Sequence, residues 1–371
     1  MEQTSDFEIF LVATPGLEAP LHAEATEKGF ASAKIVSGGV SCRGNWSDVW
    51  RANLSLRGAN KVLVRMGSFP AVHLAQLDKR ARKFPWTDFL RPDIPVKVEA
   101  TSRKSRIYHA GAARQRVERA ITETLGASVS VDAGLRILLR IDKDICTFSV
   151  DTSGEPLHKR GHKPAVAKAP MRETMAAMFL RDCGFDGSKP VLDPMCGSGT
   201  FVIEAAEIAL GLNPGRSRRF AFEDLSGFDP EAWAAMRQSG SVKETGIQFY
   251  GSDRNAGAVE AASANSELAG VAARTAFQCR SVSDIKPPIG PKGLVIVNPP
   301  YGARIGDEKR LRSVYGSLGK VLMARFSGWR VGIVTSSQSL ARATRLPLLP
   351  AGPVVDHSGI KVRLYQAAAL P

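Results

Sequence analysis

The most specific chemistry in this sequence lies in the stretch VIVNPPYGARIG, residues 295–306. An apolar run that reads as a strand ends there in Asn298, Pro299, Pro300 and Tyr301. Tandem prolines remove two backbone donors and stiffen the chain, while their carbonyls remain able to accept hydrogen bonds. The Asn298 oxygen and the Pro299 carbonyl can together accept from the exocyclic amine of a nucleobase, and Tyr301 can stack on that base.

Such an amine is a poor nucleophile because its lone pair is delocalised into the ring. Two acceptors would favour its pyramidal form and direct the lone pair at a methyl sulfonium, with no strong general base required. Taken alone, the motif also suits a plain rigid turn. The motifs that accompany it in the same order along the chain favour the catalytic interpretation.

A glycine turn follows a buried strand in VLDPMCGSGTFVIEAA, residues 191–206. The strand ends in Asp193, the turn holds Gly197 and Gly199, and a helix begins near Gly199. This geometry brings backbone close to a nucleotide-like ligand at the carboxyl edge of a sheet. The turn is not a phosphate loop, because it lacks the GxxxxGK(S/T) pattern. It is also not GxGxxG, because Gly197 and Gly199 are followed by Thr200 and by no third glycine of that motif. An acid before the turn suits an ammonium better than a pyrophosphate, which indicates S-adenosylmethionine (SAM) rather than NAD.

Two further acids follow strand-like runs. Asp253 can accept from both ribose hydroxyls of an adenosine cofactor. It lies far beyond the usual interval of about 20 residues after the glycines, so residues 213–245 are interpreted as an insertion. Asp284 could meet the adenine amine, although taken alone it is more simply a surface turn acid.

Length and composition place limits on the class of protein. The chain has 371 residues, with 44% apolar and 23% charged side chains, which at about 150 residues per domain predicts a globular protein of two or three domains. No run approaches the roughly 18 apolar residues of a membrane helix, and the N-terminus has acids where a secretory signal would be basic, so we expect a cytoplasmic protein. The five cysteines and six histidines show no metal-ligand spacing, so we expect no metal.

The net charge of +14 is concentrated in residues 79–116, which hold eleven basic and three acidic side chains. Such a segment is typical of a surface that binds a polyanion. Aromatic side chains among them could stack on unpaired bases or belong to the core; these are Phe84, Trp86, Phe89 and Tyr108. A second basic cluster, HKRGHK at 158–163, could hold RNA between domains. The candidate RNA contacts are Lys83, Arg103, Lys104, Arg106, Arg114, Lys159 and Arg160.

The order of elements predicts an α/β chain in three parts. Residues 1–60 read as β-α-β-β, typical of a small ferredoxin-like unit, and residues 61–152 form a second α+β unit. Residues 153–170 are rich in Gly, Pro and Lys and read as a linker. From 171 to 371, strands alternate with helices, which predicts a parallel sheet covered on both faces.

Together these motifs resemble the THUMP-domain RNA methyltransferases, and within them the bacterial 23S rRNA guanine-N2 methyltransferase group in its single-methyltransferase form. Besides the two motifs quoted above and GSDRNAGA, the resemblance is carried by KSRIYHAGAARQRVERAI (104–121) and VDTSGEPLHKRGHKPAVAKAPMRETMAA (150–177). It runs from about residue 100 onward, and the first 60 residues resemble the family only in pattern. Larger relatives carry a second methyltransferase domain, so one methylation activity is expected here.

The resemblance implies a ferredoxin-like region and a THUMP domain ahead of a Rossmann-like methyltransferase domain that binds SAM. It places Arg172 and Glu173 near the carboxylate end of the cofactor and assigns the NPPY residues to the target base. The implied cofactor-binding residues are Arg172, Glu173, Asp193, Pro194, Cys196, Gly197, Gly199, Thr200, Asp253, Arg254 and Asp284.

The reaction expected from this resemblance is methyl transfer to N2 of a guanosine in 23S rRNA. Methylation of tRNA guanosine, adenine-N6 methylation of nucleic acid and a non-catalytic RNA-binding assembly factor remain as alternatives. A guanine amine inside a duplex is out of reach, so the target should lie in a loop or be extruded from its stack.

Overall fold

The computed structural model describes residues 6–161, 171–301 and 308–371, and the chain divides into two compact units. Unit 1 comprises the residues up to 13, 22–157 and 218–239, and unit 2 comprises 14–21, 158–217 and 240–371. Each unit is described by itself. None of the helices in the described ranges is both long enough and apolar enough to span a membrane.

Unit 1 is built on one seven-stranded sheet with strand order β2-β3-β1-β4-β7-β6-β5. The strands are β1 (Phe7–Val12), β2 (Lys34–Val36), β3 (Gly39–Gly44), β4 (Lys61–Pro70), β5 (Val96–Arg103), β6 (Leu135–Asp142) and β7 (Ile145–Asp151). Strand β4 pairs with β1 on one side and with β7 on the other. The predicted boundary at residues 60 and 61 therefore falls where the strand shared by both halves of the sheet begins.

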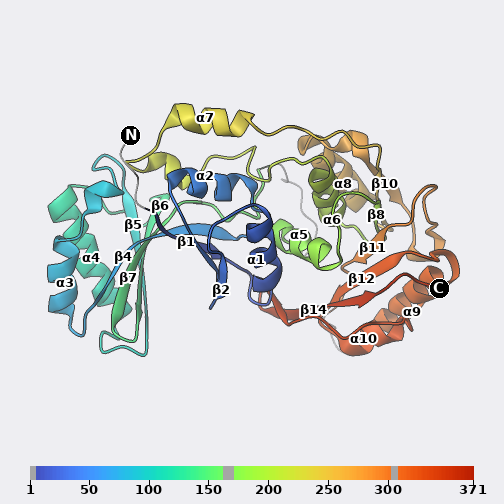
Figure 1. Ribbon diagram of the computed structural model, residues 1–371. Helices are drawn as coiled ribbons and strands as arrows, with labels where there is room; N and C mark the ends of the chain where they lie inside the picture. Colours follow the sequence, from blue (N-terminus) through green and yellow to red (C-terminus); the bar gives the residue numbers. More distant parts are fainter. Residues whose placement is uncertain (1–5, 162–170, 302–307) are drawn as a thin grey trace. The chain divides into compact units, whose positions relative to one another are not determined.

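The helices of the unit 1 sequence lie largely where the apolar periodicity predicts them. They are α2 (Trp46–Ser55), α3 (Leu74–Arg82), α4 (Ala110–Leu125) and α7 (Pro230–Gln238), of which α7 was not predicted. Helix α1 (Glu18–Glu27) begins in the unit 2 segment 14–21 and continues into unit 1. Helix α4 buries Ala113, Val117 and Ile121, which recur every four residues, and it ends at Gly126 with φ +83°. Helices α3 and α4 pack side by side (Figure 1).

The expected insertion at 213–245 has a structural role that the sequence did not reveal. Its residues 218–239, including α7, belong to unit 1. The Phe222 N–H donates to the Thr152 carbonyl at 3.0 Å, and the Phe222 ring stacks on Trp50 with centroids 6.1 Å apart. Arg218 adds hydrogen bonds to backbone carbonyls of the segment after β7. Phe222 and its aromatic neighbours therefore belong to the core of unit 1. The interpretation of 213–245 as an insertion did not predict this packing.

Unit 2 also contains a seven-stranded sheet, with order β10-β9-β8-β11-β12-β14-β13. The strands are β8 (Val191–Asp193), β9 (Phe249–Asp253), β10 (Thr275–Cys279), β11 (Leu294–Val297), β12 (Arg330–Thr335), β13 (Val355–His357) and β14 (Ile360–Ala367). The five strands from β10 to β12 are parallel. The expectation of a wholly parallel sheet is wrong at its end, because β14 pairs antiparallel with both β12 and β13.

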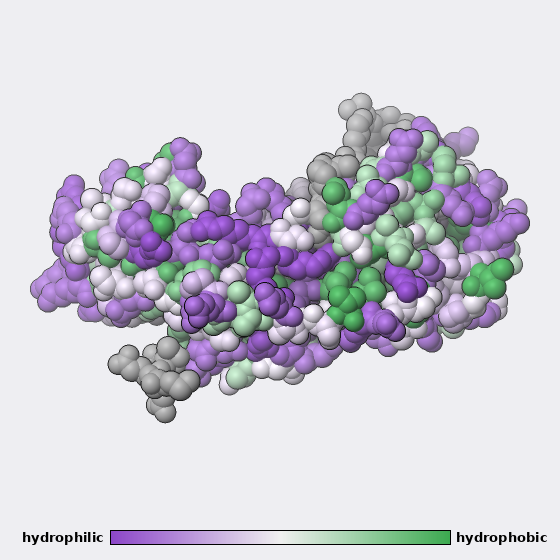
Figure 2. Space-filling view, turned by 90° about the horizontal axis from the view of Figure 1, so that it is seen from above, coloured by the Kyte–Doolittle hydropathy of each residue, from purple (hydrophilic) through white to green (hydrophobic). Residues whose placement is uncertain are grey.

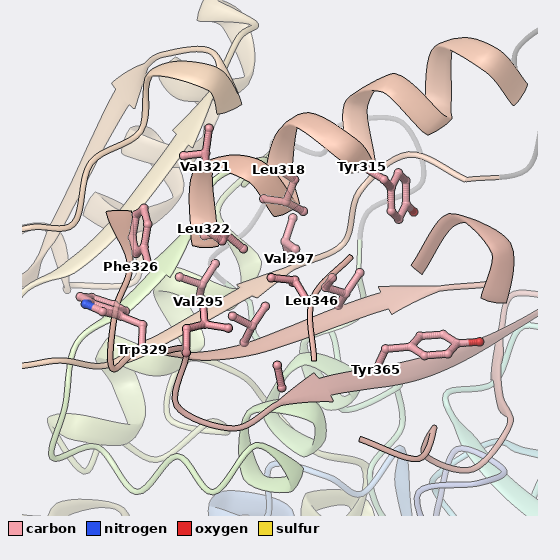
Figure 3. Close-up of a cluster of buried hydrophobic side chains, with 14 of the residues drawn as sticks. Val295, Val297, Tyr315, Leu318, Val321, Leu322, Phe326, Trp329, Leu346 and Tyr365 are labelled. Atoms are coloured by element: carbon pink, nitrogen blue, oxygen red, sulfur yellow. The ribbon is translucent and has the colours of Figure 1, made fainter. Parts of the chain in front are cut away.

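Helices cover both faces of this second sheet (Figure 1). They are α5 (Glu173–Asp182), α6 (Thr200–Ala209), α8 (Ala256–Leu268), α9 (Glu308–Arg325) and α10 (Gln338–Ala343). Val295 and Val297 of β11 pack with side chains of α9 such as Leu318 and Leu322 (Figure 3). The residue between them, Ile296, is also buried and lies beside Gly332 on the other face. Burial of the whole strand explains its continuous apolar sequence.

Candidate active site

Three strands of unit 2 bring the predicted site residues to one edge of the sheet. Strand β8 pairs in parallel with β9 on one side and with β11 on the other. Strand β8 ends in Asp193, β9 ends in Asp253, and β11 is followed directly by Asn298. Because parallel strands share the direction of their carboxyl ends, these three residues, far apart in sequence, lie along the same edge.

Backbone N–H groups of the glycine turn donate hydrogen bonds to residues at the end of β9. The Gly197 N–H donates to the Asp253 carboxylate at 3.1 Å, and the Cys196 N–H donates to the Ser252 carbonyl at 2.9 Å. Gly199 has φ +86°, and a Cβ there would lie 3.1 Å from the Ala262 Cβ. The turn thus requires glycine for both conformation and space.

Asp193 is fully buried at the end of β8. Burial raises the pKa of Asp193 to about 8, and the nearby Asp253 charge contributes in the same direction. The Asp193 Oδ1 accepts one hydrogen bond, from the Met195 N–H at 3.0 Å. A ligand that brings a positive charge would stabilise the ionised carboxylate, so this environment fits the ammonium of SAM.

Two buried polar atoms at this edge have no hydrogen-bond partner among the described residues: the Asn298 Oδ1 and the Ser252 Oγ. An unsatisfied buried polar group costs about 1–3 kcal/mol, so such atoms mark places where a bound molecule can supply the missing partner. The free Oδ1 follows β11 at the position that the sequence assigns to acceptance from a target amine. The residues present thus fit both a cofactor and an amine-bearing base.

The rest of the NPPY motif is held by side chains from other elements. Pro299 is buried and Pro300 is exposed. Tyr315, on α9, donates to Thr335 Oγ1 at 2.9 Å, and its hydroxyl also lies 3.4 Å from the Pro300 carbonyl. The Tyr301 hydroxyl lies 3.0 Å from Nδ1 of His357, and burial raises the pKa of Tyr301 to about 12, so the phenol stays protonated at neutral pH. Gly302, which follows the motif, lies outside the described residues.

The other candidate cofactor residues occupy different surroundings. Arg172 is the N-cap of α5, where its guanidinium donates to the Ser358 Oγ at 3.2 Å, and Glu173 begins the helix. Burial raises the pKa of the Cys196 thiol, so it is neutral and serves as packing. The remaining candidates divide by exposure: Pro194 and Thr200 are buried, and Arg254 and Asp284 are exposed.

The structure contradicts the prediction that Arg160 contacts RNA. Its Nε donates to the Glu204 carboxylate at 3.0 Å, and the two side chains are only 1% and 2% exposed. Binding a phosphate would require breaking a buried ion pair, which is strongly unfavourable. The interpretation of Arg160 as an RNA contact is therefore wrong, while Lys159 beside it is exposed. His162 and Lys163 of the same cluster lie outside the described residues.

The candidate RNA-binding side chains of unit 1 lie at its surface. Lys83, Arg103, Lys104, Arg106 and Arg114 are all exposed. Two of them have carboxylate partners, with Arg106 pairing to Asp144 at 3.7 Å and Arg114 to Glu118 at 3.3 Å. Hydrophilic residues cover much of unit 1 on the face shown in Figure 2.

The aromatic side chains of the same segment differ in their exposure to solvent. Trp86 is buried and its indole N–H donates to the Ala81 carbonyl at 2.8 Å. Phe84 packs edge to face on Phe148 and lies 6.5 Å from Phe89 between ring centroids. Tyr108 is 74% exposed. Of the four aromatics, Tyr108 is the exposed one, since Trp86 is buried and Phe84 and Phe89 are half-buried.

Sequence reasoning missed three residues at the site: Ser252, Tyr315 and His357. Ser252 precedes Asp253 and could have been noticed there. His357 is separated from Tyr301 by 56 residues, and Tyr315 lies in the middle of a helix, so neither carried a local signal. Only pairing of β14 with β12 and β13 brings His357 to the motif.

Three family models match successive parts of the chain. The RlmL ferredoxin-like domain matches residues 8–63, the THUMP domain matches 71–151, and the RMKL-like methyltransferase domain matches 160–349, just over half of the chain. The predicted architecture, a Rossmann-like methyltransferase domain preceded by ferredoxin-like and THUMP regions, is confirmed.

Among curated proteins, the chain is 36% identical to the ribosomal RNA large subunit methyltransferase K/L of Allochromatium vinosum, over 94% of this chain and 51% of the relative. It is 30% identical to a Synechocystis protein named as a candidate RNA methyltransferase, over 90% of this chain and 89% of that protein. The chain spans about half the length of the K/L relatives that it matches.

Two solved structures share the fold over nearly the whole chain. One, from Listeria monocytogenes and named as a predicted N6-adenine-specific DNA methylase, is 30% identical with a TM-score of 0.89 and covers 99% of this chain and 97% of that chain. The other, SMU.472, named as a methyltransferase and complexed with S-adenosylhomocysteine (SAH), is 26% identical with a TM-score of 0.89 and covers 99% of both chains. These matches show that the chain belongs to the RMKL-like methyltransferase family, with ferredoxin-like and THUMP domains ahead of the methyltransferase domain.

Proposed function

We propose that this protein methylates N2 of a guanosine in 23S rRNA. The observation that carries the proposal is the buried Asn298 Oδ1, which has no hydrogen-bond partner in the described part of the chain and belongs to a residue followed directly by two prolines at the sheet edge. Support for RNA comes from the THUMP match and from the names of the K/L relatives, which refer to large-subunit ribosomal RNA.

The protein side of the reaction then follows from the NPPY residues. The Asn298 Oδ1 and the Pro299 carbonyl accept the two amine protons and hold the nitrogen lone pair toward the methyl group. Tyr301 stacks on the extruded guanine. SAM supplies an electrophilic methyl group on a sulfonium. One amine proton leaves to solvent after transfer, so the site needs no strong base.

The cofactor would be held by the carboxyl edges of β8 and β9. Asp193 would pair with its ammonium and Asp253 with its ribose hydroxyls, while Gly197 and Gly199 leave room for its close approach. Arg172 would bind its carboxylate. We retain residues 1–60, 61–152 and 171–371 as the proposed domains, with residues 218–239 assigned to the first unit.

A pH dependence of cofactor affinity follows from the buried carboxylate. Because the pKa of Asp193 is raised to about 8 and a cation binds its ionised form, protonation competes with binding below that pH. We expect the Kd for SAM to rise by roughly tenfold per unit as the pH falls from 7 to 6. Calorimetric titration across pH 6–9 measures this, and Asp193→Asn should remove the slope. An equal slope in that variant would assign the proton to another group.

The exposed cluster Arg103, Lys104 and Arg106 is expected to bind RNA phosphates. Reversing all three charges should weaken RNA binding and reduce the slope of log Kd against log salt by roughly two to three, about one for each phosphate that is no longer neutralised. A matched control reverses three exposed lysines of unit 2, Lys243, Lys292 and Lys320. Equal slope changes in both variants would mean that only net charge matters.

Methylation of adenine N6 is a second candidate, because the Listeria structure at 30% identity carries that name. Nucleoside mass spectrometry of separated 23S rRNA, tRNA and DNA from a deletion strain distinguishes these reactions. Loss of one N2-methylguanosine from 23S rRNA is the expected result. Its loss from tRNA would keep the chemistry and change the substrate, whereas loss of N6-methyladenine would overturn the assignment of the base.

A further inference from the structure

The turn between β13 and β14 contacts both halves of the candidate site. His357, at the end of β13, is only 5% exposed, and its Nδ1 lies 3.0 Å from the Tyr301 hydroxyl. The next residue, Ser358, accepts a hydrogen bond from Arg172. Two consecutive residues of one turn thus contact one residue of the NPPY motif and one that would hold the cofactor.

The turn has little freedom to move. His357 pairs with Ile360 across the hairpin, and the two residues between them have positive φ, +54° at Ser358 and +86° at Gly359, which is typical of a tight type I′ turn. The Asp356 carboxylate accepts from the Gly359 N–H at 2.9 Å and pairs with Lys361 at 2.5 Å. These contacts hold the backbone of the turn that carries His357.

The interaction between the two rings restricts the orientation of Tyr301. A tyrosine ring that stacks on a base must be held in one plane, but Tyr301 directly follows two prolines in a chain segment outside regular structure. Its half-buried hydroxyl can donate to Nδ1 of the neutral His357 tautomer that carries its proton on Nε2. This hydrogen bond removes the freedom of the tyrosine side chain before the base arrives, which lowers the entropic cost of stacking.

We propose that His357 is a positioning residue for methyl transfer, because it holds the Tyr301 ring in the orientation that stacks on the target base. This inference rests on the proposed function, since it requires the NPPY motif to bind the base. It assigns a role to the hairpin of β13 and β14, in which no site residue was predicted from the sequence.

The test compares four variants by steady-state kinetics on RNA and by SAH titration. His357→Leu and Tyr301→Phe each remove the hydrogen bond, and we expect either to lower kcat/KM for RNA by about three- to tenfold, as expected for one such bond, with SAH affinity unchanged. The double variant should lose no more than either single one. His357→Asn, which keeps an acceptor near the position of Nδ1, should recover most of the loss.

Several results would contradict the proposal. Multiplicative losses in the double variant would mean that the two residues act separately, and full activity in Tyr301→Phe would show that the bond is unimportant. Should His357→Leu not fold, Tyr301→Phe and His357→Asn still decide the question. Asn298→Ala serves as the reference variant. If it retains turnover, the proposed base site itself is wrong. If it is inactive while the His357 and Tyr301 variants behave as wild type, only the role of His357 is wrong.

Discussion

Replacement of Asn298 by alanine is expected to reduce methyl transfer by at least 100-fold while leaving SAM binding nearly unchanged. The variant removes the buried acceptor that would orient the amine, an interaction made chiefly in the transition state. Loss of one preorganised polar group of this kind costs about 10²–10³ in kcat in other enzymes. Single-turnover methylation with saturating protein measures the chemical step, and SAH titration measures the cofactor site.

A conservative variant provides the control for this prediction. Asn298→Asp keeps an oxygen at the Oδ1 position and nearly the same volume, so it should retain more activity than the alanine variant. If Asn298→Ala instead loses SAH binding and activity together, the side chain belongs to the cofactor site and the base must bind elsewhere. Similar activity of the alanine and aspartate variants would show that the acceptor is not what matters.

Replacement of Asp253 by alanine is expected to weaken SAM binding by about 100-fold or more. The variant removes the acceptor for the Gly197 N–H, which orders the glycine turn, and the group that would accept from the ribose hydroxyls. Hydrogen bonds to charged groups contribute about 1.5–3 kcal/mol each, and two such losses together account for this factor. Calorimetric titration with SAM or SAH measures the change.

Glu260 supplies the matched control for this variant. It is an exposed carboxylate on α8, the helix that follows β9, so Glu260→Ala changes the charge equally without removing a contact to the glycine turn. We expect it to bind SAM as the unmodified protein does. Equal weakening in both variants would indicate a general electrostatic effect, and unchanged affinity in Asp253→Ala would remove this residue from the cofactor site.

The elements of this fold were largely readable from the sequence, because helices and strands are encoded by local periodicity. The run LRILLRI (135–141) has the alternation typical of a strand, and β6 buries alternate residues there. The buried residues of α4 recur in the same way at the spacing of one helix face. Pairing between distant strands has no comparable local signal. The antiparallel pairing of β14 with β12 and β13 therefore did not follow from the sequence, which predicted only a parallel sheet.

The presence of charged residues in a segment predicted its exposure to solvent less reliably than periodicity predicted helices and strands. The cluster HKRGHK read as a solvated basic patch, but Arg160 is buried against Glu204 on α6. A charged side chain is rarely buried unless it pairs with a group of opposite charge. The partner of Arg160 lies 44 residues away in the sequence, so the local pattern could not indicate it. The core contacts of the aromatics at 220–233 were likewise not predicted, because their partners in unit 1, such as Trp50, lie far from them in the sequence.

The motifs of this protein and the chemistry of their residues are encoded locally, in short segments of the chain. The acids that end β8 and β9, the glycine turn and NPPY are contiguous strings, whose residue types and spacing indicate a ligand wherever they occur. Tertiary structure alone decided that these strings share one sheet edge, that the Asn298 oxygen is buried and free to accept, and that His357 reaches Tyr301. Such facts depend on strand order and burial, which are properties of the whole packed sheet rather than of any segment.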